Sequence, residues 1–382
     1  MRTSRIAIVV AAGALAAGGV AACGGSSDSS TSKPAASKDA GGSGVATAQS
    51  ELAPVVKYPD SVGVSAPLKR SPSGKTVDYM ECGVTECKVI GDLLEQGAKP
   101  LGMRINRVSA GNTPESIARA FDQAVQDKPD GVVASGVSKA LYAKQLTQLK
   151  QLGIPVVSMG TADLPGNDGL AQVLLGGNSY LNAGKYAADW AITDSKGSAK
   201  VLLVTAPVFD FNKPLAQSFQ ATMKRNCPGC DVHVMGVSPD DIGKGVPGQI
   251  VSYLQQKPDT DYVITSFGSL MIGVPQAIGA AGLQGKVNLF TVAPSQADFQ
   301  NAKAGLEKGN LASSKQYLGW ITADQIARAM TGQNPAKVVE DGKLPWWHIF
   351  HGPDEKWDVK VEPDWPYFNG FQDQFKKLWG AQ

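Results

Sequence analysis

Histidine is scarce in this sequence, and the residue patterns that mark many enzymes are missing. Only three of the 382 residues are histidine. No G-x-S-x-G nucleophile turn, G-x-x-x-x-G-K-[ST] phosphate loop or H-E-x-x-H zinc motif occurs. His348 and His351 could hold a metal with a nearby carboxylate, but Pro353 interrupts any helix that would align them. We therefore expect a protein that is not an enzyme and that needs no metal or cofactor.

An excess of charge of one sign is also lacking, and so is an apolar run long enough to span a membrane. The chain has 36 basic and 34 acidic residues, and the two signs are interspersed, so nucleic acid is not an expected partner. The longest apolar run covers residues 6–20, which is shorter than the roughly 20 residues of a spanning helix. With 43% hydrophobic residues, the body of the chain should be globular.

The N-terminus has basic residues, an apolar run and small residues in the order typical of a secretory signal peptide. Arg2 and Arg5 precede the apolar run, and small residues then lead to Cys23. Residues 20–23 resemble the bacterial lipobox, which implies cleavage before Cys23 and attachment of lipid to it. A plain signal peptide with an incidental cysteine is the alternative. We expect a signal peptide at 1–22 and a lipidated, flexible tether at 23–72, because residues 24–44 contain no large apolar side chain.

The other four cysteines form two close pairs, Cys82 with Cys87 and Cys227 with Cys230. In an oxidising compartment such pairs indicate disulfides. A redox C-x-x-C motif and a zinc site are the alternatives. The second pair has the redox spacing, but it follows a helical pattern and precedes a strand, whereas redox pairs usually lie at a helix start. We predict two structural disulfides.

From residue 76 onward, short apolar strands alternate with helices. The expected strands are 76–80, 103–108, 131–134 and 155–158, then 200–205, 232–237, 262–265 and 287–292. The expected helices lie near 87–100, 114–127, 138–152, 179–194, 213–226, 247–257, 269–281 and 296–308. This alternation predicts an α/β fold with two doubly wound parallel-sheet domains.

Three segments, residues 124–133, 149–157 and 176–184, resemble the type I periplasmic binding proteins of ABC importers. They are most similar to the sugar-binding branch that includes ribose- and galactose-binding proteins. The resemblance implies two lobes joined by three hinge crossings, near 161–163, 316–318 and 341–346. The lobes would comprise 73–161 plus 317–343, and 162–316 plus 344–382. The five tryptophans of the tail either pack it onto a lobe or reach the cleft or the importer.

The ligand should lie beyond the carboxyl ends of the strands, where the two sheets face each other. Planar polar groups would bind hydroxyls and aromatic rings would cover C–H faces. An ordinary cap, turn or core role is the alternative for each candidate. The candidates are Glu81, Asn112, Ser135 and Ser138 in the first lobe, Phe209, Asp210, Phe211, Asn212, Phe267 and Ser295 in the second, and Gln316 and Tyr317 at a crossing.

This candidate site departs from the sugar-binding pattern in two loops. Phe267-Gly268 stands where the family commonly has Asn-Asp, and Ala293 stands where it commonly has Asp. The resemblance implies a monomeric, extracytoplasmic lipoprotein, anchored to the bacterial cell membrane, that delivers a small molecule to ABC importer membrane subunits by hinge closure. A sugar is the family's usual ligand. The alternatives are a less polar aromatic or alicyclic ligand, and a ligand-reporting partner of a membrane sensor.

Overall fold

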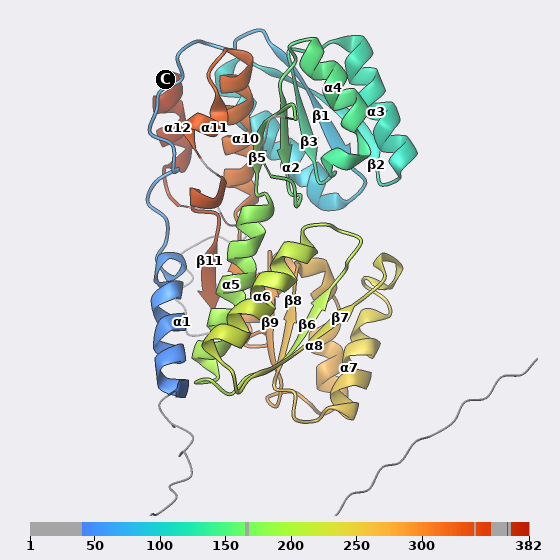
Figure 1. Cartoon of the computed structure of the whole chain (residues 1–382), viewed down its shortest axis with the longest axis vertical. Coiled ribbons are helices and arrows are strands. Elements are labelled where there is room, and N and C mark those ends of the chain that lie inside the picture. The colour runs from blue at the N-terminus through green and yellow to red at the C-terminus, as the bar shows by residue number, and fades with distance from the viewer. Residues whose placement is uncertain (1–39, 165–167, 340, 353–364, 366–367, 382) are drawn as a thin grey trace, which may run out of the picture. The chain divides into compact units, whose positions relative to one another are not determined.

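The strands form two separate sheets in the computed structural model, which describes residues 40–164, 168–339, 341–352, 365 and 368–381 (Figure 1). The first sheet has five parallel strands in the order β2-β1-β3-β4-β5. The second has the order β11-β10-β9-β8-β6-β7, and only β11 runs antiparallel to its neighbour. The predicted α/β fold with two parallel-sheet domains is confirmed. The predicted signal peptide and Cys23 lie outside the described residues.

The strands of the first sheet are β1 (Thr76–Cys82), β2 (Arg104–Gly111), β3 (Gly131–Ser135), β4 (Val156–Met159) and β5 (Leu170–Leu174). Those of the second are β6 (Lys200–Thr205), β7 (Asp231–Gly236), β8 (Tyr262–Thr265), β9 (Asn288–Val292), β10 (Gly309–Ala312) and β11 (His348–His351). Central strands such as β3 and β4 are buried along their whole length. This burial is why they appear in the sequence as unbroken apolar runs.

Helices cover both sheets (Figure 1). They are α1 (Ala40–Val56), α2 (Thr85–Ala98), α3 (Pro114–Asp127), α4 (Ala143–Gln151), α5 (Gly177–Asp194), α6 (Asn212–Asn226), α7 (Val246–Gln256), α8 (Val274–Ala280), α9 (Gln296–Lys303), α10 (Lys315–Met330), α11 (Pro335–Val338) and α12 (Phe371–Trp379). Short 3₁₀ turns are η1 (Lys99–Leu101), η2 (Lys139–Leu141), η3 (Pro239–Asp241), η4 (Gly268–Met271) and η5 (Asp341–Lys343). Within the described residues, no helix has the length and apolarity needed to cross a bilayer.

Three connections between the sheets are present, but the first is displaced from its expected place. Strand β5 still pairs with β4 of the first sheet, so the chain crosses at 175–176 rather than at 161–163. It returns between β10 and α10, which packs against α2, and crosses a third time between α11 and β11. The strand β5 was not predicted, because five residues with one polar side chain give little periodic signal.

The expected tether is wrong from residue 40 onward, because α1 is a packed helix. It buries Ala48, Leu52 and Val55 and lies against α5 and α6 of the second lobe. Close approach explains its small residues, since a Cβ at Gly44 would lie only 1.9 Å from the carbonyl oxygen of Asn226. The small side chains at the start of α1 reflect tight helix packing and not a solvated linker.

The tail also departs from the expected lobe boundary. Strand β11 belongs to the second sheet, as expected for residues after 343, but α12 packs against α10 of the first lobe. Trp379 stacks on Trp320 with ring centroids 5.6 Å apart, and Trp346 and Trp365 are fully buried. These described tail tryptophans pack the chain onto the lobes, while Trp357 lies outside the described residues.

Candidate functional site

The loops at the carboxyl ends of the two sheets meet across the lobes. The backbone N–H of Ala162, after β4, donates to Asp210 Oδ1, after β6, at 3.0 Å. The hydroxyl of Ser269, after β8, donates to Glu86 Oε1, at the start of α2, at 3.2 Å. Both contacts join a first-lobe loop to a second-lobe loop. The two sheets therefore aim their carboxyl ends at each other, which is where open parallel sheets bind ligands.

Three of the predicted site residues, all phenylalanines, gather at this edge of the second lobe. The ring of Phe267 meets Phe209 edge-on, with centroids 5.6 Å apart, and Phe211 at 5.9 Å. Phe209 and Phe211 lie 6.1 Å apart with nearly parallel rings. All three side chains are half-buried, so the cluster keeps apolar ring surface beside the facing loops. Such surface suits the C–H faces of a small ligand.

Two further aromatic residues that the sequence analysis missed extend this ring cluster. Tyr180 of α5 stacks on Phe211 with centroids 4.6 Å apart, and Trp347 lies 6.2 Å from Tyr180. The indole N–H of Trp347 donates to the carbonyl of Ser179 at 3.0 Å. Both rings are almost fully buried. Tyr180 supports Phe211, and Trp347 supports Tyr180, which no local pattern at positions 180 or 347 indicates.

Two carboxylates lie close enough to interact electrostatically, Asp163 after β4 and Asp210 after β6. Asp163 accepts hydrogen bonds from the backbone N–H of Lys139 at 2.8 Å and from Ser138 Oγ at 3.4 Å. Burial raises the pKa of Asp163, and the charge of Asp210 raises this pKa further. Asp210 and Ser138 were predicted site residues, whereas Asp163 was not. The pair concentrates negative charge between the lobes, which disfavours an anionic ligand.

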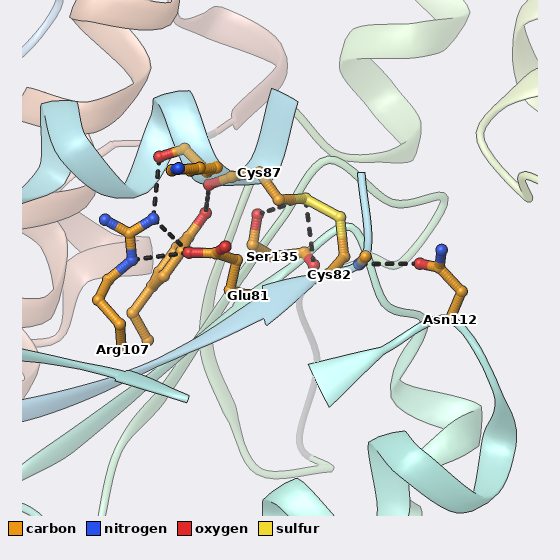
Figure 2. The surroundings of a disulfide bond; sticks show 9 residues. Glu81, Cys82, Cys87, Arg107, Asn112 and Ser135 are labelled. Atoms are coloured by element: carbon orange, nitrogen blue, oxygen red, sulfur yellow. Dashed lines mark hydrogen bonds and ion pairs between the residues drawn. A yellow bond between two sulfur atoms is a disulfide. The ribbon is translucent and has the colours of Figure 1, made fainter. Parts of the chain in front are cut away.

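Glu81, the carboxylate among the first-lobe candidates, forms an ion pair with Arg107 (Figure 2). Its carboxylate pairs with Arg107, whose Nε donates to Oε2 at 2.8 Å. Arg107 also donates to Asp92 at 2.8 Å and to Glu95 at 3.2 Å. The structure therefore places Glu81 in a network within the first lobe.

Asn112 and Ser135 hold the loop that follows β1 (Figure 2). The side-chain oxygen of Asn112 accepts from the backbone N–H of Gly83 at 2.9 Å. Ser135, the buried last residue of β3, donates to Cys87 Sγ at 3.4 Å. Both side chains lie near the facing edge, as predicted, and both are used to position backbone and sulfur.

Asn212 and Ser295 organise second-lobe loops. Asn212 is buried and donates to the carbonyls of Ala206 and Phe209, at 2.9 and 3.1 Å. Ser295 caps α9 in a capping box with Asp298. A Cβ at Gly268 would lie 2.4 Å from both Ser295 N and Asp298 Oδ2. This close approach explains the glycine that departs from the sugar-binding pattern.

The two candidates at the second crossing lie at the start of α10. Tyr317 is fully buried, and its hydroxyl donates to the carbonyl of Val62 at 2.8 Å. Its ring packs against Trp346 at 5.3 Å. Gln316 is half-buried beside it. Tyr317 therefore belongs to the core that joins the N-terminal segment to α10, rather than to the ring cluster.

Both predicted disulfides are confirmed. Cys82 and Cys87 are bonded with Cα atoms 5.6 Å apart, and Cys227 and Cys230 with Cα atoms 5.4 Å apart. The first lies at the facing edge, and the second lies at the C-terminal end of α6, whose N-terminal end adjoins Phe211. In the part of the chain that the structure describes, no group of three histidine, cysteine or acidic residues could hold a metal ion.

Comparison with known proteins gives a consistent set of matches. The family described as "Periplasmic binding protein domain" matches residues 87–334. The fructose import binding protein FruE of Bifidobacterium longum is 21% identical over 235 residues, which cover 60% of this chain and 70% of FruE. The glucose-galactose binding protein GanP of Geobacillus stearothermophilus superposes with a TM-score of 0.63 at 15% identity, covering 74% of this chain and 99% of GanP.

A further solved structure differs in its ligand. The 5-methylthioribose transporter solute-binding protein of Thermotoga lettingae, in complex with 5-methylthioribose, superposes with a TM-score of 0.63 at 14% identity. The match covers 73% of this chain and 87% of that protein.

Proposed function

This chain belongs to the periplasmic binding protein family, a family of binding proteins rather than enzymes, and from that premise we propose that it captures a sugar or sugar-like solute for an ABC importer. The observation that carries the proposal is the ring cluster of Phe209, Phe211 and Phe267 beside Asp210, at the edge where both lobes meet. Similarity to a fructose import binding protein supports a sugar.

The ligand would act by stabilising the closed arrangement of the lobes. A solute that touches both facing edges binds the closed form better than the open form, and so shifts the balance toward closure. A solute held by one lobe alone would not shift it. Closed and open forms present different surfaces to the importer's membrane subunits, which explains how loading could be sensed.

A ligand less polar than a simple hexose is the second candidate. In the first lobe, Glu81, Asn112 and Ser135 already have partners within that lobe, so fewer polar groups remain for hydroxyls. The rings of the second lobe supply apolar surface instead. A similar fold binds 5-methylthioribose, which carries a thioether on a pentose. A site with fewer polar partners for hydroxyls and more aromatic rings than a typical sugar site suits such a solute.

A thermal-shift screen tests both candidates, because a ligand that binds only the folded state raises the melting temperature. The panel comprises D-fructose, D-glucose, D-galactose, 5-methylthioribose, aromatic acids and alicyclic alcohols. We expect at least one sugar or sugar-like compound to raise it. Turnover of a hit, or stabilisation by the aromatic acids alone, would contradict the proposal.

We also propose that the mature chain begins at a lipidated Cys23 and remains on the outer side of the bacterial cell membrane. The support is the order of charge, apolar run and small residues before Cys23. A C23S variant expressed in a bacterium that processes lipoproteins should appear in the soluble fraction, whereas the parent chain should sediment with membranes. Equal distribution of the two would contradict lipidation.

A further inference from the structure

The loop closed by the Cys82–Cys87 disulfide, here called the disulfide loop, lies at the facing edge of the first lobe. We propose that it is a latch: it fixes Glu86 where Glu86 accepts the Ser269 hydrogen bond of the other lobe, and so favours the closed arrangement. The contact measures 3.2 Å. The consequence for solute affinity rests on the proposed function, but the closure of the lobes does not.

Helix α2, which carries Glu86, lacks the usual means of fixing its start. Its N-cap residue is Val84, which makes no side-chain capping bond, because valine has no acceptor to offer. The next helix, α3, instead begins with a capping box between Thr113 and Ser116. In α2 the disulfide ties the first turn to the end of β1 and takes over this task.

The disulfide loop is held on three further sides (Figure 2). The hydroxyl of Tyr79 donates to the carbonyl of Cys87 at 2.6 Å. The backbone N–H of Gly83 donates to Asn112 at 2.9 Å, and Ser135 donates to Cys87 Sγ at 3.4 Å. Two of these residues, Asn112 and Ser135, are the polar side chains expected to contact ligand. Their observed use is to make the loop rigid.

The partner of Glu86 is equally well fixed. Ser269 lies in η4, directly after Gly268, which packs against Ser295 and Asp298 so closely that a Cβ would not fit. A hydrogen bond between two rigid loops loses little side-chain freedom when it forms. The hydrogen bond between Ser269 and Glu86 therefore stabilises the closed arrangement whenever the lobes meet.

The Cys227–Cys230 disulfide provides a matched control. It also closes a short loop, but it follows α6, where Cys227 Sγ lies 3.2 Å from the carbonyl of Gly197. Neither cysteine takes part in the two hydrogen bonds that join the facing edges, Ala162 to Asp210 and Ser269 to Glu86. Removing it tests the general effect of losing a disulfide without touching the latch.

The experiment compares five variants of the full chain: C82S/C87S, C227S/C230S, S269A, S269T and the combination C82S/C87S/S269A. Small-angle X-ray scattering gives the radius of gyration without solute, and calorimetry gives the dissociation constant for the best sugar of the panel. Circular dichroism confirms folding, and S269A keeps the test valid if C82S/C87S fails to fold. S269T retains the hydroxyl and should restore closure.

We expect C82S/C87S and S269A each to increase the radius of gyration without solute, and to weaken binding by about three- to tenfold. Adding S269A to C82S/C87S should weaken binding no further, because both act through one contact. C227S/C230S should match the parent chain. Unchanged radii in both latch variants would overturn the latch. Failure of every sugar to bind would overturn the proposed function and leave the scattering result to decide the latch.

Discussion

Two regions of the molecule are held together by different forces. At the facing edges, the two bonds described above join half-buried loops. At the terminal seam, defined here as residues 62–68 with Arg328 and α12, the N-terminal segment packs onto α10 of the first lobe. Arg328 is fully buried, pairs with Asp324 at 2.7 Å and donates to the carbonyl of Ala66 at 2.8 Å.

This difference indicates which region can move. Breaking a buried ion pair leaves an uncompensated charge and is costly, whereas a single hydrogen bond between solvated loops exchanges with water at little cost. The terminal seam should therefore stay intact while the facing edges separate. We therefore expect residues 62–68 to move with the first lobe.

The largest expected effect is at the terminal seam. Replacing Arg328 by methionine removes the cationic partner of buried Asp324, to which Trp379 and Gln325 also donate, and should lower the unfolding free energy by about 3–5 kcal/mol. The matched control is Lys376→Met, because Lys376 pairs with Asp373 on the exposed side of α12 and should cost about 0.5 kcal/mol or less. Urea titration of both variants measures the difference. Similar losses in the two would contradict the assigned role of Arg328.

The docking of α1 should give the protein a pH-dependent stability. Burial raises the pKa of Asp189 from its ordinary value of 3.8 to about 6, although Lys185, which also pairs with Glu51 of α1, opposes this. The folded state therefore binds the proton more tightly. The contribution of Asp189 to the unfolding free energy is fully present below about pH 4. It is lost as the pH rises to about 6, and the loss is at most about 3 kcal/mol.

The variant D189N isolates this contribution. Its unfolding free energy should change less between these two pH values than that of the parent chain, as measured by urea titration at each pH. An equal slope in both proteins would show that another group is responsible.

At the facing edges, the expected effects are on binding rather than on folding. Phe267→Ala removes a ring that contacts two others and should weaken the best solute by about 1.5–3 kcal/mol, or roughly 10- to 100-fold. Tyr253→Ala is the control, because Tyr253 also stacks on another ring, His233, but on α7 away from the site. Calorimetric titration distinguishes them. Equal affinities for Phe267→Ala and the parent chain would remove the ring cluster from the site.

A smaller effect is expected for Asp210. Asp210→Ala removes the acceptor for the N–H of Ala162 and should weaken binding by about 1 kcal/mol, close to fivefold. Asp210→Asn keeps an acceptor oxygen and should retain most of the affinity. Tighter binding by both variants would mean that the negative charge opposes the solute.

The sequence predicted eight of the eleven described strands because buried parallel strands are apolar, and it missed β5, β10 and β11. It named Phe209, Phe211 and Phe267 as candidates because they follow two strand ends. It failed at the terminal seam. Gly44 and the small residues of α1 look like a linker, since nothing local reveals the helices they pack against. Arg328 and Asp324 likewise look like an ordinary surface pair four residues apart, and only the tertiary structure buries them.

The same limit applies to the polar candidates. Position relative to a strand end predicted that Asn112 and Ser135 would lie at the facing edge, and they do. Whether such a side chain faces a ligand or holds a loop depends on contacts with residues far away in sequence, such as Gly83 and Cys87. Spacing alone does not contain that information.

The central claim is that a solute closes the lobes while the terminal seam stays fixed. Hydrogen–deuterium exchange of the full chain, with and without the best sugar of the panel, tests it most directly. We predict slower exchange on binding at the facing loops around 83–86, 160–163 and 206–211, and unchanged exchange at 62–68 and 371–379. Protection of only one lobe's loops, or loosening of the seam on binding, would contradict the account.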